Sequence, residues 1–332
     1  MSRLTAVNID CNFDYGYERR RLAAAGIGLI ERKAVTEDEI IAACADADAV
    51  ILEGAKTPVN ARVIGALRRC QVIAKYAVGV DNIDVAAATA AGIIVANAAD
   101  YCTEEVSDHA VALLLACARR VVVLDRHVQA GGWGGVARTV PVRRISPLTL
   151  GLVGLGRIAR ATARKMAGFR LRIIAADPYL PAGATEPGVE IVPLPELLRQ
   201  SDLVSVHTPL TPETRGLLNE ACFRAMKPTA YLVNTSRGPV VDEGALVRAL
   251  RENQIAGAAL DVVEEEPLPA SSPLRGMPQV ILTPHTAADS TDSMQHVRGT
   301  VVDSVVAALA GAWPPFPVNP KVKPRHWQRG PG

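Results

Sequence analysis

Short runs of β-branched and aliphatic residues alternate with helical patterns along the whole chain, and this alternation constrains the fold most strongly. The runs lack a polar–apolar alternation, so they indicate strands that are buried on both faces. Such strands, separated by helices, form parallel sheets covered by helices on each side. The predicted strands are Leu4–Ile9, Ala49–Leu52, Val72–Lys75, Ile93–Ala96, Thr149–Val153, Arg172–Ala176, Leu203–His207, Tyr231–Asn234, Gly257–Leu260 and Val280–Leu282. The predicted helices are Thr36–Ala47, Glu104–Ala130, Ile158–Gly168, Pro195–Ser201 and Glu243–Glu252.

The order of these elements predicts an α/β fold with two parallel sheets. The first sheet ends near Asn97, and the second extends from the strand before Gly154 to about His285. The helix Glu104–Ala130 would link them. A last helix, about Ser293–Ala310, has no strand after it and would return to the first sheet. We therefore expect a discontinuous first domain of residues 1–98 and 291–332, and a continuous second domain of residues 99–290.

The composition excludes several classes of protein. Hydrophobic residues make up 49% of the chain and charged residues 21%, and the net charge of +2 is too small to indicate a nucleic-acid or membrane partner. The six cysteines form no Cys-x-x-Cys pair, which argues against a metal or redox site and favours reduced thiols. The N-terminus has no apolar run of signal-peptide length, and Arg119-Arg120 interrupts the apolar stretch Ala110–Leu124. We expect a cytoplasmic protein.

A glycine-rich segment, GLVGLGRIA, follows a predicted strand and opens a helix. Gly154 would permit a tight turn, Gly156 would let the backbone approach a pyrophosphate, and Ala159 would allow the helix to pack closely on the sheet. The helix N-terminus would present its free N–H groups to the phosphates. The alternative is an ordinary strand–turn–helix corner that uses glycine for its geometry. The cofactor residues predicted here are Gly154, Gly156, Arg157 and Ile158.

The carboxylate of Asp177 favours the dinucleotide site over the ordinary corner. Asp177 ends the next predicted strand, at about the 20-residue offset at which an acidic residue binds the ribose. A carboxylate there accepts a hydrogen bond from the 2′-hydroxyl of NAD and repels the 2′-phosphate of NADP. Residues 178–181 include neither arginine nor lysine. The predicted cofactor is NAD.

Three side chains that can act on a carbonyl follow successive predicted strands: Arg237, Glu266 and His285. His285 titrates near neutrality and can exchange a proton with a hydroxyl group. Glu266 can orient its ring and favour its protonated form. Arg237 keeps its charge and suits a substrate carboxylate and a polarised carbonyl oxygen.

Each of these residues also has a structural interpretation. A histidine after proline is often a surface residue, Arg237 can pair with Asp242, and the run Glu264–Glu266 is typical of a solvated face. The functional interpretation is favoured because all three residues follow strands of one predicted dinucleotide domain, where the carboxyl ends of the strands meet. Together these features indicate hydride transfer to or from an oxygen-bearing carbon. His207 ends another strand and would line the cofactor crevice.

At this point the chain resembles the D-isomer-specific 2-hydroxyacid dehydrogenase family over nearly its whole length. The segment Asp100–Arg120 and the motif DPYLP most resemble the branch of C-terminal-binding proteins and their bacterial relatives. The matching motifs are YAVGVDNID (from Tyr76), GLVGLGRIA with Asp177, VHTPLTPETRGLLN (from Val206), NTSRGPVVDEGAL (from Asn234), ALDVVEEEP (from Ala259) and TPHTAA (from Thr283).

The resemblance implies two doubly wound, Rossmann/flavodoxin-like domains, of which the discontinuous one binds substrate and the other binds NAD. It assigns Arg237 to the orientation of substrate, Glu266 to the support of the histidine, His285 to acid–base catalysis and Asp261 to the nicotinamide carboxamide. The backbone at Val78, Gly79 and Val80, with Lys75 beside it, would hold the substrate carboxylate. The further cofactor residues are His207, Thr208, Pro209, Thr235 and Ser236.

The sequence departs from the family pattern at three places. Ala159 replaces a glycine, Lys75 replaces an arginine, and Ala288-Asp289 stands where an aromatic residue is common. The leading hypothesis is an NAD-dependent D-2-hydroxyacid dehydrogenase acting on a small-molecule 2-keto or 2-hydroxy acid. The alternatives are an NAD-sensing, corepressor-like binding protein with vestigial activity, and an enzyme of the same fold that oxidises a small one-carbon or non-carbon acid.

The segment Gly131–Pro147 is long, aperiodic and rich in glycine and arginine, and it carries Trp133. Loops of this length are usually functional or belong to an interface. Members of the family are usually dimers joined through the cofactor domain, so the resemblance implies a homodimer to which this segment contributes.

Overall fold

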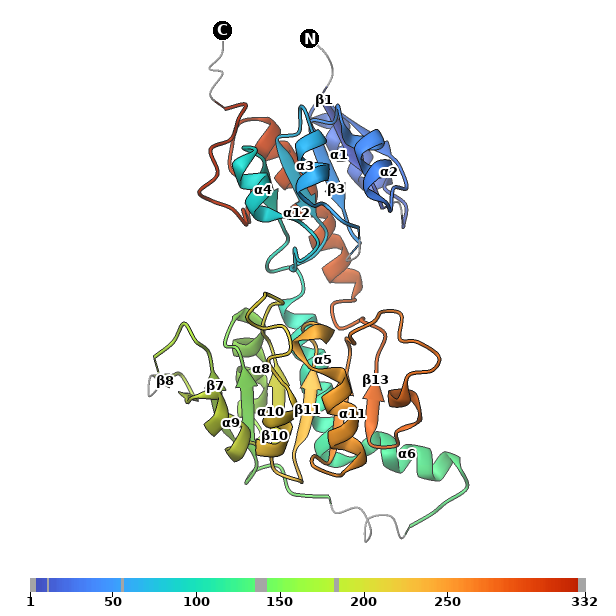
Figure 1. Ribbon diagram of the computed structural model, residues 1–332, viewed down its shortest axis with the longest axis vertical. Coiled ribbons are helices and arrows are strands. Elements are labelled where there is room, and N and C mark those ends of the chain that lie inside the picture. Colours follow the sequence, from blue (N-terminus) through green and yellow to red (C-terminus); the bar gives the residue numbers. More distant parts are fainter. Residues whose placement is uncertain (1–3, 11, 55–56, 135–141, 182–184, 328–332) are drawn as a thin grey trace. The chain divides into compact units, whose positions relative to one another are not determined.

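The computed structural model describes the whole chain except residues 1–3, 11, 55–56, 135–141, 182–184 and 328–332. The chain divides into two compact units: residues 1–101 with 290–332, and residues 102–289. Each unit contains a parallel sheet flanked by helices (Figure 1). The predicted α/β class, with two doubly wound sheets and a discontinuous first unit, is confirmed.

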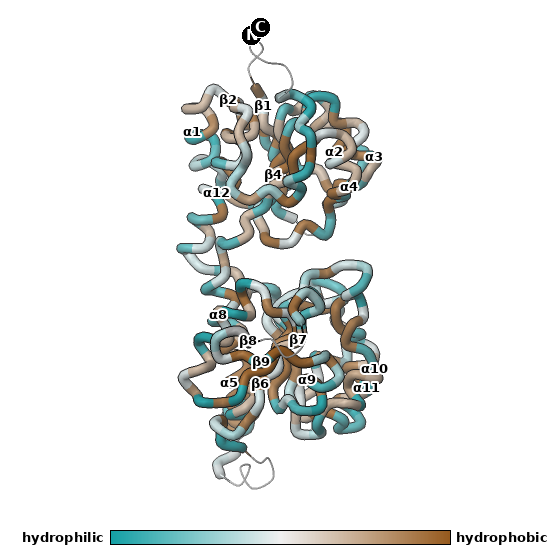
Figure 2. Tube along the Cα trace, turned by 90° about the vertical axis from the view of Figure 1, so that its left-hand side faces the viewer, coloured by the Kyte–Doolittle hydropathy of each residue, from teal (hydrophilic) through white to brown (hydrophobic). Residues whose placement is uncertain are grey.

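The sheet of the first unit has the order β2-β1-β3-β4-β5, and all of its strands are parallel. Figure 2 shows the hydrophobic strands of both units, in brown, at the centre of each unit. The C-terminal helix α12 packs against α1 and β4 and contributes Val297, Val301 and Val305 to the core. The strands are β1 Leu4–Asn8, β2 Ile27–Glu31, β3 Ala49–Leu52, β4 Val72–Lys75 and β5 Ile94–Ala96. The helices are α1 Gly16–Ala24, α2 Glu37–Cys44, α3 Ala61–Ala66, α4 Val85–Ala90 and α12 Thr291–Leu309.

The sheet of the second unit has the order β13-β12-β11-β10-β6-β7-β9-β8, in which only β8 is antiparallel to its neighbour. The chain leaves β6 toward β7 on one side and reaches β10 on the other. In sheets of this kind ligands bind at such a reversal, outside the carboxyl ends of the strands. The strands are β6 Thr149–Val153, β7 Arg172–Ala176, β8 Thr185–Glu186, β9 Val189–Ile191, β10 Leu203–Val206, β11 Tyr231–Asn234, β12 Gly257–Leu260 and β13 Val280–Leu282. The helices are α5 Thr103–Arg119, α6 Val121–Gln129, α8 Arg157–Ala167, α9 Leu194–Gln200, α10 Glu220–Ala225 and α11 Glu243–Arg251, with 3-10 turns η1 Gly238–Val240 and η2 Pro273–Gly276.

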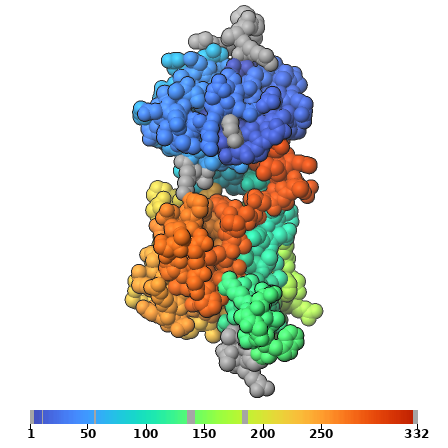
Figure 3. Space-filling view, turned by 90° about the vertical axis from the view of Figure 1, so that its right-hand side faces the viewer, coloured from blue at the N-terminus to red at the C-terminus, as the bar shows by residue number. Residues whose placement is uncertain are grey.

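The prediction of one continuous helix over Glu104–Ala130 is wrong. Arg120 adopts a left-handed conformation, with φ of 55°, which ends α5 and redirects the chain into α6. No glycine, asparagine or proline marks this break in the sequence. Helix α5 packs against α8 and the sheet, whereas α6 has no buried residue and lies at the surface, in green in Figure 3. Among the described residues no helix is both long and apolar enough to cross a membrane.

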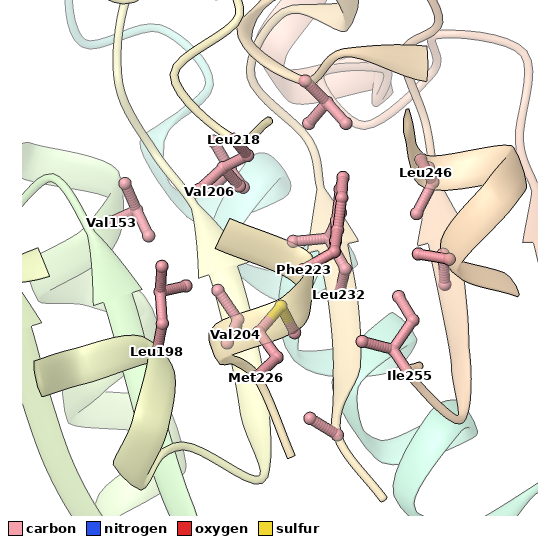
Figure 4. Close-up of a cluster of buried hydrophobic side chains, with 14 of the residues drawn as sticks. Val153, Leu198, Val204, Val206, Leu218, Phe223, Met226, Leu232, Leu246 and Ile255 are labelled. Atoms are coloured by element: carbon pink, nitrogen blue, oxygen red, sulfur yellow. The ribbon is translucent and has the colours of Figure 1, made fainter. Parts of the chain in front are cut away.

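Hydrophobic clusters cover both faces of the second sheet and hold its strands in place. On one face Val204, Val206 and Leu232 project from the central strands toward Phe223 and Met226 (Figure 4). Continuous burial of the strands leaves their carboxyl ends as the place where polar side chains emerge, and this placement positions the candidate site.

Candidate active site

The turn between β6 and α8 leaves a helix N-terminus open. Gly154 has φ of +88°, and a β-carbon there would lie 3.0 Å from the backbone oxygen of His207, so only glycine fits. Gly156 is the N-cap residue of α8, and among the described residues no side chain caps the helix there. A β-carbon built on Gly156 would meet no atom within 4 Å apart from those of its chain neighbours. Arg157 and Ile158 are the first two residues of α8. The first N–H groups of the helix therefore have space for an anion such as a pyrophosphate.

Asp177 lies directly after β7 and holds the glycine turn. Its Oδ2 accepts a hydrogen bond from the backbone N–H of Leu155 at 2.9 Å, and its Oδ1 accepts one from Tyr179 at 3.0 Å. Each carboxylate oxygen retains a second lone pair. Asp177 can therefore accept a further hydrogen bond from a ribose hydroxyl without releasing the turn.

Two buried hydroxyl groups line the carboxyl ends of β10 and β11. The Oγ1 atoms of Thr208 and Thr235 are buried and have no hydrogen-bond partner among the described residues. An unsatisfied buried hydroxyl group costs ~1–3 kcal/mol, so this pair fits a crevice that receives a polar ligand. Pro209 and Ser236 follow the two threonines. Together with the open N-terminus of α8, these hydroxyls fit a bound dinucleotide.

His207 precedes Thr208 at the carboxyl end of β10 and is neutral. Its Nε2 lies 2.9 Å from Oγ of Ser205. Burial lowers the pKa of His207 to about 4, so the ring is uncharged near neutral pH. His207 would therefore add no positive charge to a dinucleotide site at this end of the sheet.

His285 and Glu266, which lie 19 residues apart in the sequence, form a direct pair. Nδ1 of His285 lies 2.7 Å from Oε2 of Glu266. This hydrogen bond raises the pKa of His285 against the effect of burial, and the Glu266 charge adds to the increase. Burial opposes the charged form of Glu266, but the hydrogen bond and charge of His285, with the more distant Arg237, keep the pKa of Glu266 below its ordinary value. The pair is poised to hold a proton on the imidazole.

Glu266 is selected from a run of three glutamates by its backbone contact. Its Oε1 accepts a hydrogen bond from the N–H of Val263 at 3.2 Å, which turns the side chain back toward His285. Glu264 and Glu265 are exposed. The N–H of Glu264 instead donates to Glu243 at 3.0 Å. The sequence prediction of Glu266 as the partner of the histidine therefore agrees with the geometry.

A close backbone contact brings Arg237 toward this pair. A β-carbon on Gly238 would lie 1.9 Å from the backbone oxygen of Val263, so the loop after β11 rests directly on the loop after β12. The charge of Arg237 acts on the pKa of both His285 and Glu266. The structure thus gathers the three predicted catalytic side chains at the carboxyl ends of neighbouring strands.

The buried amide of Asn234 shapes the loop that carries Arg237. Its Nδ2 donates to the backbone oxygen of Arg237 at 3.0 Å, and its Oδ1 accepts from both N–H and Oγ of Ser236, at 3.0 and 2.9 Å. Sequence reasoning did not single out Asn234 or Gly238. The motif that contains them was the only available signal, because their contacts are visible only once the strands are assembled.

Asp261 follows β12 and is buried, with 2% of its surface exposed. Its carboxylate binds the peptide that follows His285, through the N–H groups of Thr286 and Ala287 at 3.0 Å each. The nicotinamide contact implied for Asp261 stays a prediction. The observed contacts place Asp261 against the turn that carries His285.

The predicted substrate residues Lys75, Val78 and Gly79 belong to the first unit, whereas the residues above belong to the second. Lys75 ends β4, is buried, and donates through Nζ to the side-chain oxygen of Asn82. Asn82 in turn donates to the backbone oxygens of Gly54 and Thr57. Lys75 therefore holds the segment after β4 against the segment after β3, and Val78 is exposed within the former.

Comparison with known proteins places these features in a family. The sequence profile described as "D-isomer specific 2-hydroxyacid dehydrogenase, NAD binding domain" matches residues 111–287. The chain is 45% identical to the glyoxylate reductase of Korarchaeum cryptofilum over 80% of its own length and 81% of that protein. These relations show an oxidoreductase that acts on a 2-hydroxy acid.

Two solved structures show the same fold with nicotinamide cofactors. One is the D-lactate dehydrogenase of Aquifex aeolicus complexed with NAD and lactic acid, at 26% identity and a TM-score of 0.82, covering 92% of this chain and 96% of that one. The other is an NADPH-dependent glyoxylate/hydroxypyruvate reductase of Sinorhizobium meliloti in complex with NADP and malonate, at 28% identity and a TM-score of 0.82, covering 97% and 98%. The cofactor class is therefore a nicotinamide dinucleotide. The finer resemblance to the C-terminal-binding-protein branch stays a prediction. The chain belongs to the D-isomer-specific 2-hydroxyacid dehydrogenase family.

Proposed function

We propose that this chain is an NAD-dependent D-2-hydroxyacid dehydrogenase that reduces a small 2-keto acid, with His285 as its acid–base residue. The observation that carries the proposal is the 2.7 Å pair of His285 and Glu266, on the same sheet edge as the open N-terminus of α8. A dinucleotide site alone would suit a binding protein. A paired imidazole at the carboxyl ends of the same sheet supports chemistry on a carbonyl group.

In this proposal each ring nitrogen of His285 has a separate task. Nδ1 is engaged by Glu266, so Nε2 is the atom left to give a proton to the carbonyl oxygen of the keto acid. A nicotinamide cofactor held by this unit would supply the hydride for the carbonyl carbon. Arg237 carries a permanent charge and would hold the substrate carboxylate and polarise the carbonyl group. In the reverse direction neutral His285 accepts the proton of the hydroxyl group.

The choice of NAD over NADP rests on Asp177. Its carboxylate stands at the end of β7, fixed by Leu155 and Tyr179, where a ribose 2′-hydroxyl would donate to it and a 2′-phosphate would be repelled. Thr208 and Thr235 would satisfy their buried hydroxyls on the cofactor. Lys75, Val78 and Gly79 would serve the substrate carboxylate from the first unit, with Lys75 acting through the segment that Asn82 ties in place.

A short polar 2-keto acid is the substrate class that we favour. The relative from Korarchaeum cryptofilum is a glyoxylate reductase, and Ala288-Asp289 after His285 supplies a small residue and a carboxylate where an aromatic ring is common. The test is a panel of glyoxylate, hydroxypyruvate, pyruvate and phenylpyruvate with NADH, followed by the loss of NADH absorbance.

His285→Ala should lower kcat ~10²–10⁴-fold and leave NADH affinity within about twofold. Undiminished turnover by this variant would contradict the role of His285.

We further propose a homodimer in which α6 and Trp133 take part. Val121 and Val128 of α6 are 54% and 46% exposed and Trp133 is 89% exposed, an unusual apolar surface for a short segment. A cavity of about 370 Å³ adjoins the start of α6 and is lined by Arg120 and Tyr231 among others. Residues 135–141 of the predicted interface segment lie outside the described residues. A monomer in sedimentation at micromolar concentration would refute this proposal. A cytoplasmic location also stays a prediction, which the free thiols of Cys44, Cys70, Cys117 and Cys222 support.

A further inference from the structure

We infer that His109 and Thr283 are positioning residues that act through Asp261 to hold the turn carrying His285. The inference rests on the proposed function and deepens it, because it names residues outside the catalytic pair on which the pair depends. Among the described residues, neither the side chain of His109 nor that of Thr283 forms a hydrogen bond with the side chain of His285 or Glu266. Their effect therefore has to pass through the carboxylate of Asp261.

The turn at His285 needs support because its backbone is unfavourable. His285 has φ of +56°, the left-handed region that residues with a β-carbon seldom adopt. Three hydrogen bonds hold it, and all of them end on Asp261: the N–H of His285 donates to the backbone oxygen at 2.8 Å, and those of Thr286 and Ala287 donate to the two carboxylate oxygens at 3.0 Å each. Asp261 therefore determines where the imidazole points.

A chain of donors in turn fixes the carboxylate of Asp261. Oγ1 of Thr283 lies 2.6 Å from Oδ1 of Asp261. An ionised carboxylate only accepts, so the hydroxyl group must donate to it. Nε2 of His109 lies 3.0 Å from the same hydroxyl oxygen. The single proton of the hydroxyl is already used, so Nε2 of His109 must carry the proton and donate it.

This reasoning fixes the direction of the network as His109 to Thr283 to Asp261. Nε2 carries a proton both in this neutral tautomer and in the imidazolium ion, so the donor survives protonation of His109. Nε2 also lies 3.6 Å from Oδ1 of Asp261, where a positive ring would strengthen the hold. The network is therefore a permanent support and not a switch.

The position of His109 in the fold explains why it can serve as an anchor. It belongs to α5, the long helix that packs against β11 and β12. Thr283 follows β13, and Asp261 follows β12. The network joins one rigid helix to the ends of two neighbouring strands, and it does so directly beneath the catalytic turn. Catalytic geometry displaced by about 1 Å can cost ~10²-fold in rate.

The test compares variants that keep or remove each donor. Thr283→Val and His109→Phe preserve size and remove the hydrogen bond, whereas Thr283→Ser keeps the hydroxyl and His109→Gln places an amide N–H near the position of Nε2. We expect the first pair to lower kcat for keto-acid reduction ~10-fold or more with NADH affinity within about twofold, and the second pair to retain most of the activity. Thermal unfolding of each variant controls for loss of structure.

A second readout separates positioning from a general loss of packing. A loosened turn weakens the contact of His285 with Glu266, so the pKa of His285, measured by NMR of its ring protons and assigned with His285→Ala, should fall in Thr283→Val and His109→Phe. The charges that act on this ring are Glu266, Arg237 and Asp261, and none of them is altered by these variants. The conservative variants should restore the wild-type pKa.

The outcomes distinguish this inference from the proposed function. Folded Thr283→Val or His109→Phe with unchanged kcat and unchanged pKa of His285 would overturn the inference. A loss in His109→Gln equal to that in His109→Phe would also overturn it, because the donor would then be irrelevant. If the wild type reduces no 2-keto acid, the proposed function fails, while a lowered pKa of His285 in the variants would still support the positioning network. Should Thr283→Val not fold, His109→Phe carries the same test.

Discussion

Replacement of Gly238 by alanine tests how the loops after β11 and β12 build the site. The new methyl group would lie 1.9 Å from the backbone oxygen of Val263 and 2.0 Å from its carbon, whereas ordinary contacts begin at 3.4 Å. The two loops would have to separate by about 1.5 Å, which moves Arg237 away from Glu266 and His285. A displacement of this size predicts a loss of ~10²-fold in kcat/KM. Overpacking of a buried contact also predicts a loss of roughly 1–3 kcal/mol in the free energy of unfolding.

The assay is reduction of glyoxylate or hydroxypyruvate with NADH, measured well below the unfolding temperature of the variant. The matched control is Gly244→Ala in α11, where the nearest atoms would lie at 3.4 and 3.6 Å and alanine favours the helix. We expect the control to keep wild-type activity and an equal or higher Tm. Wild-type kcat/KM in Gly238→Ala would refute the idea that the close contact of the two loops positions Arg237.

Three further outcomes follow from the same site. Glu266→Gln should lower the pKa of His285, because the hydrogen bond to the carboxylate and its charge raise it in the wild type. In the proposed mechanism protonated His285 is the donor in reduction, so the alkaline limit of the pH–rate profile should move to lower pH, and an unmoved limit would argue against the pair. Asp177→Ala should narrow the preference for NADH over NADPH in direct binding measurements, and a wild-type preference for NADPH would contradict the interpretation of Asp177. Asp289→Ala should reduce the advantage of a polar-tailed keto acid over phenylpyruvate, and a constant ratio of the two rates would show that Asp289 does not shape specificity.

Local sequence patterns were sufficient to predict the position of a strand wherever that strand is buried on both faces. The runs at Ala49–Leu52, Thr149–Val153 and Tyr231–Asn234 match β3, β6 and β11. Edge and polar elements were missed: β2 is an edge strand with half-exposed residues, and α1 has no side-chain cap and carries three arginines. Propensity and periodicity report burial, so elements with weak burial give a weak signal.

The sequence by itself determined the fold class, the glycine turn with Asp177, and the identity of Arg237, Glu266 and His285 as candidates. Each of those inferences needs only a residue type and its place after a strand, because parallel strands bring their carboxyl ends to one edge. The tertiary structure alone decided how these groups are supported. Three features depend on the assembled sheet. They are the left-handed break at Arg120, the contact of Gly238 with Val263, and the network of His109, Thr283 and Asp261. Hydrogen bonds and close contacts act over about 3 Å, and only packing of the strands and helices brings residues 109, 261 and 283 within that distance.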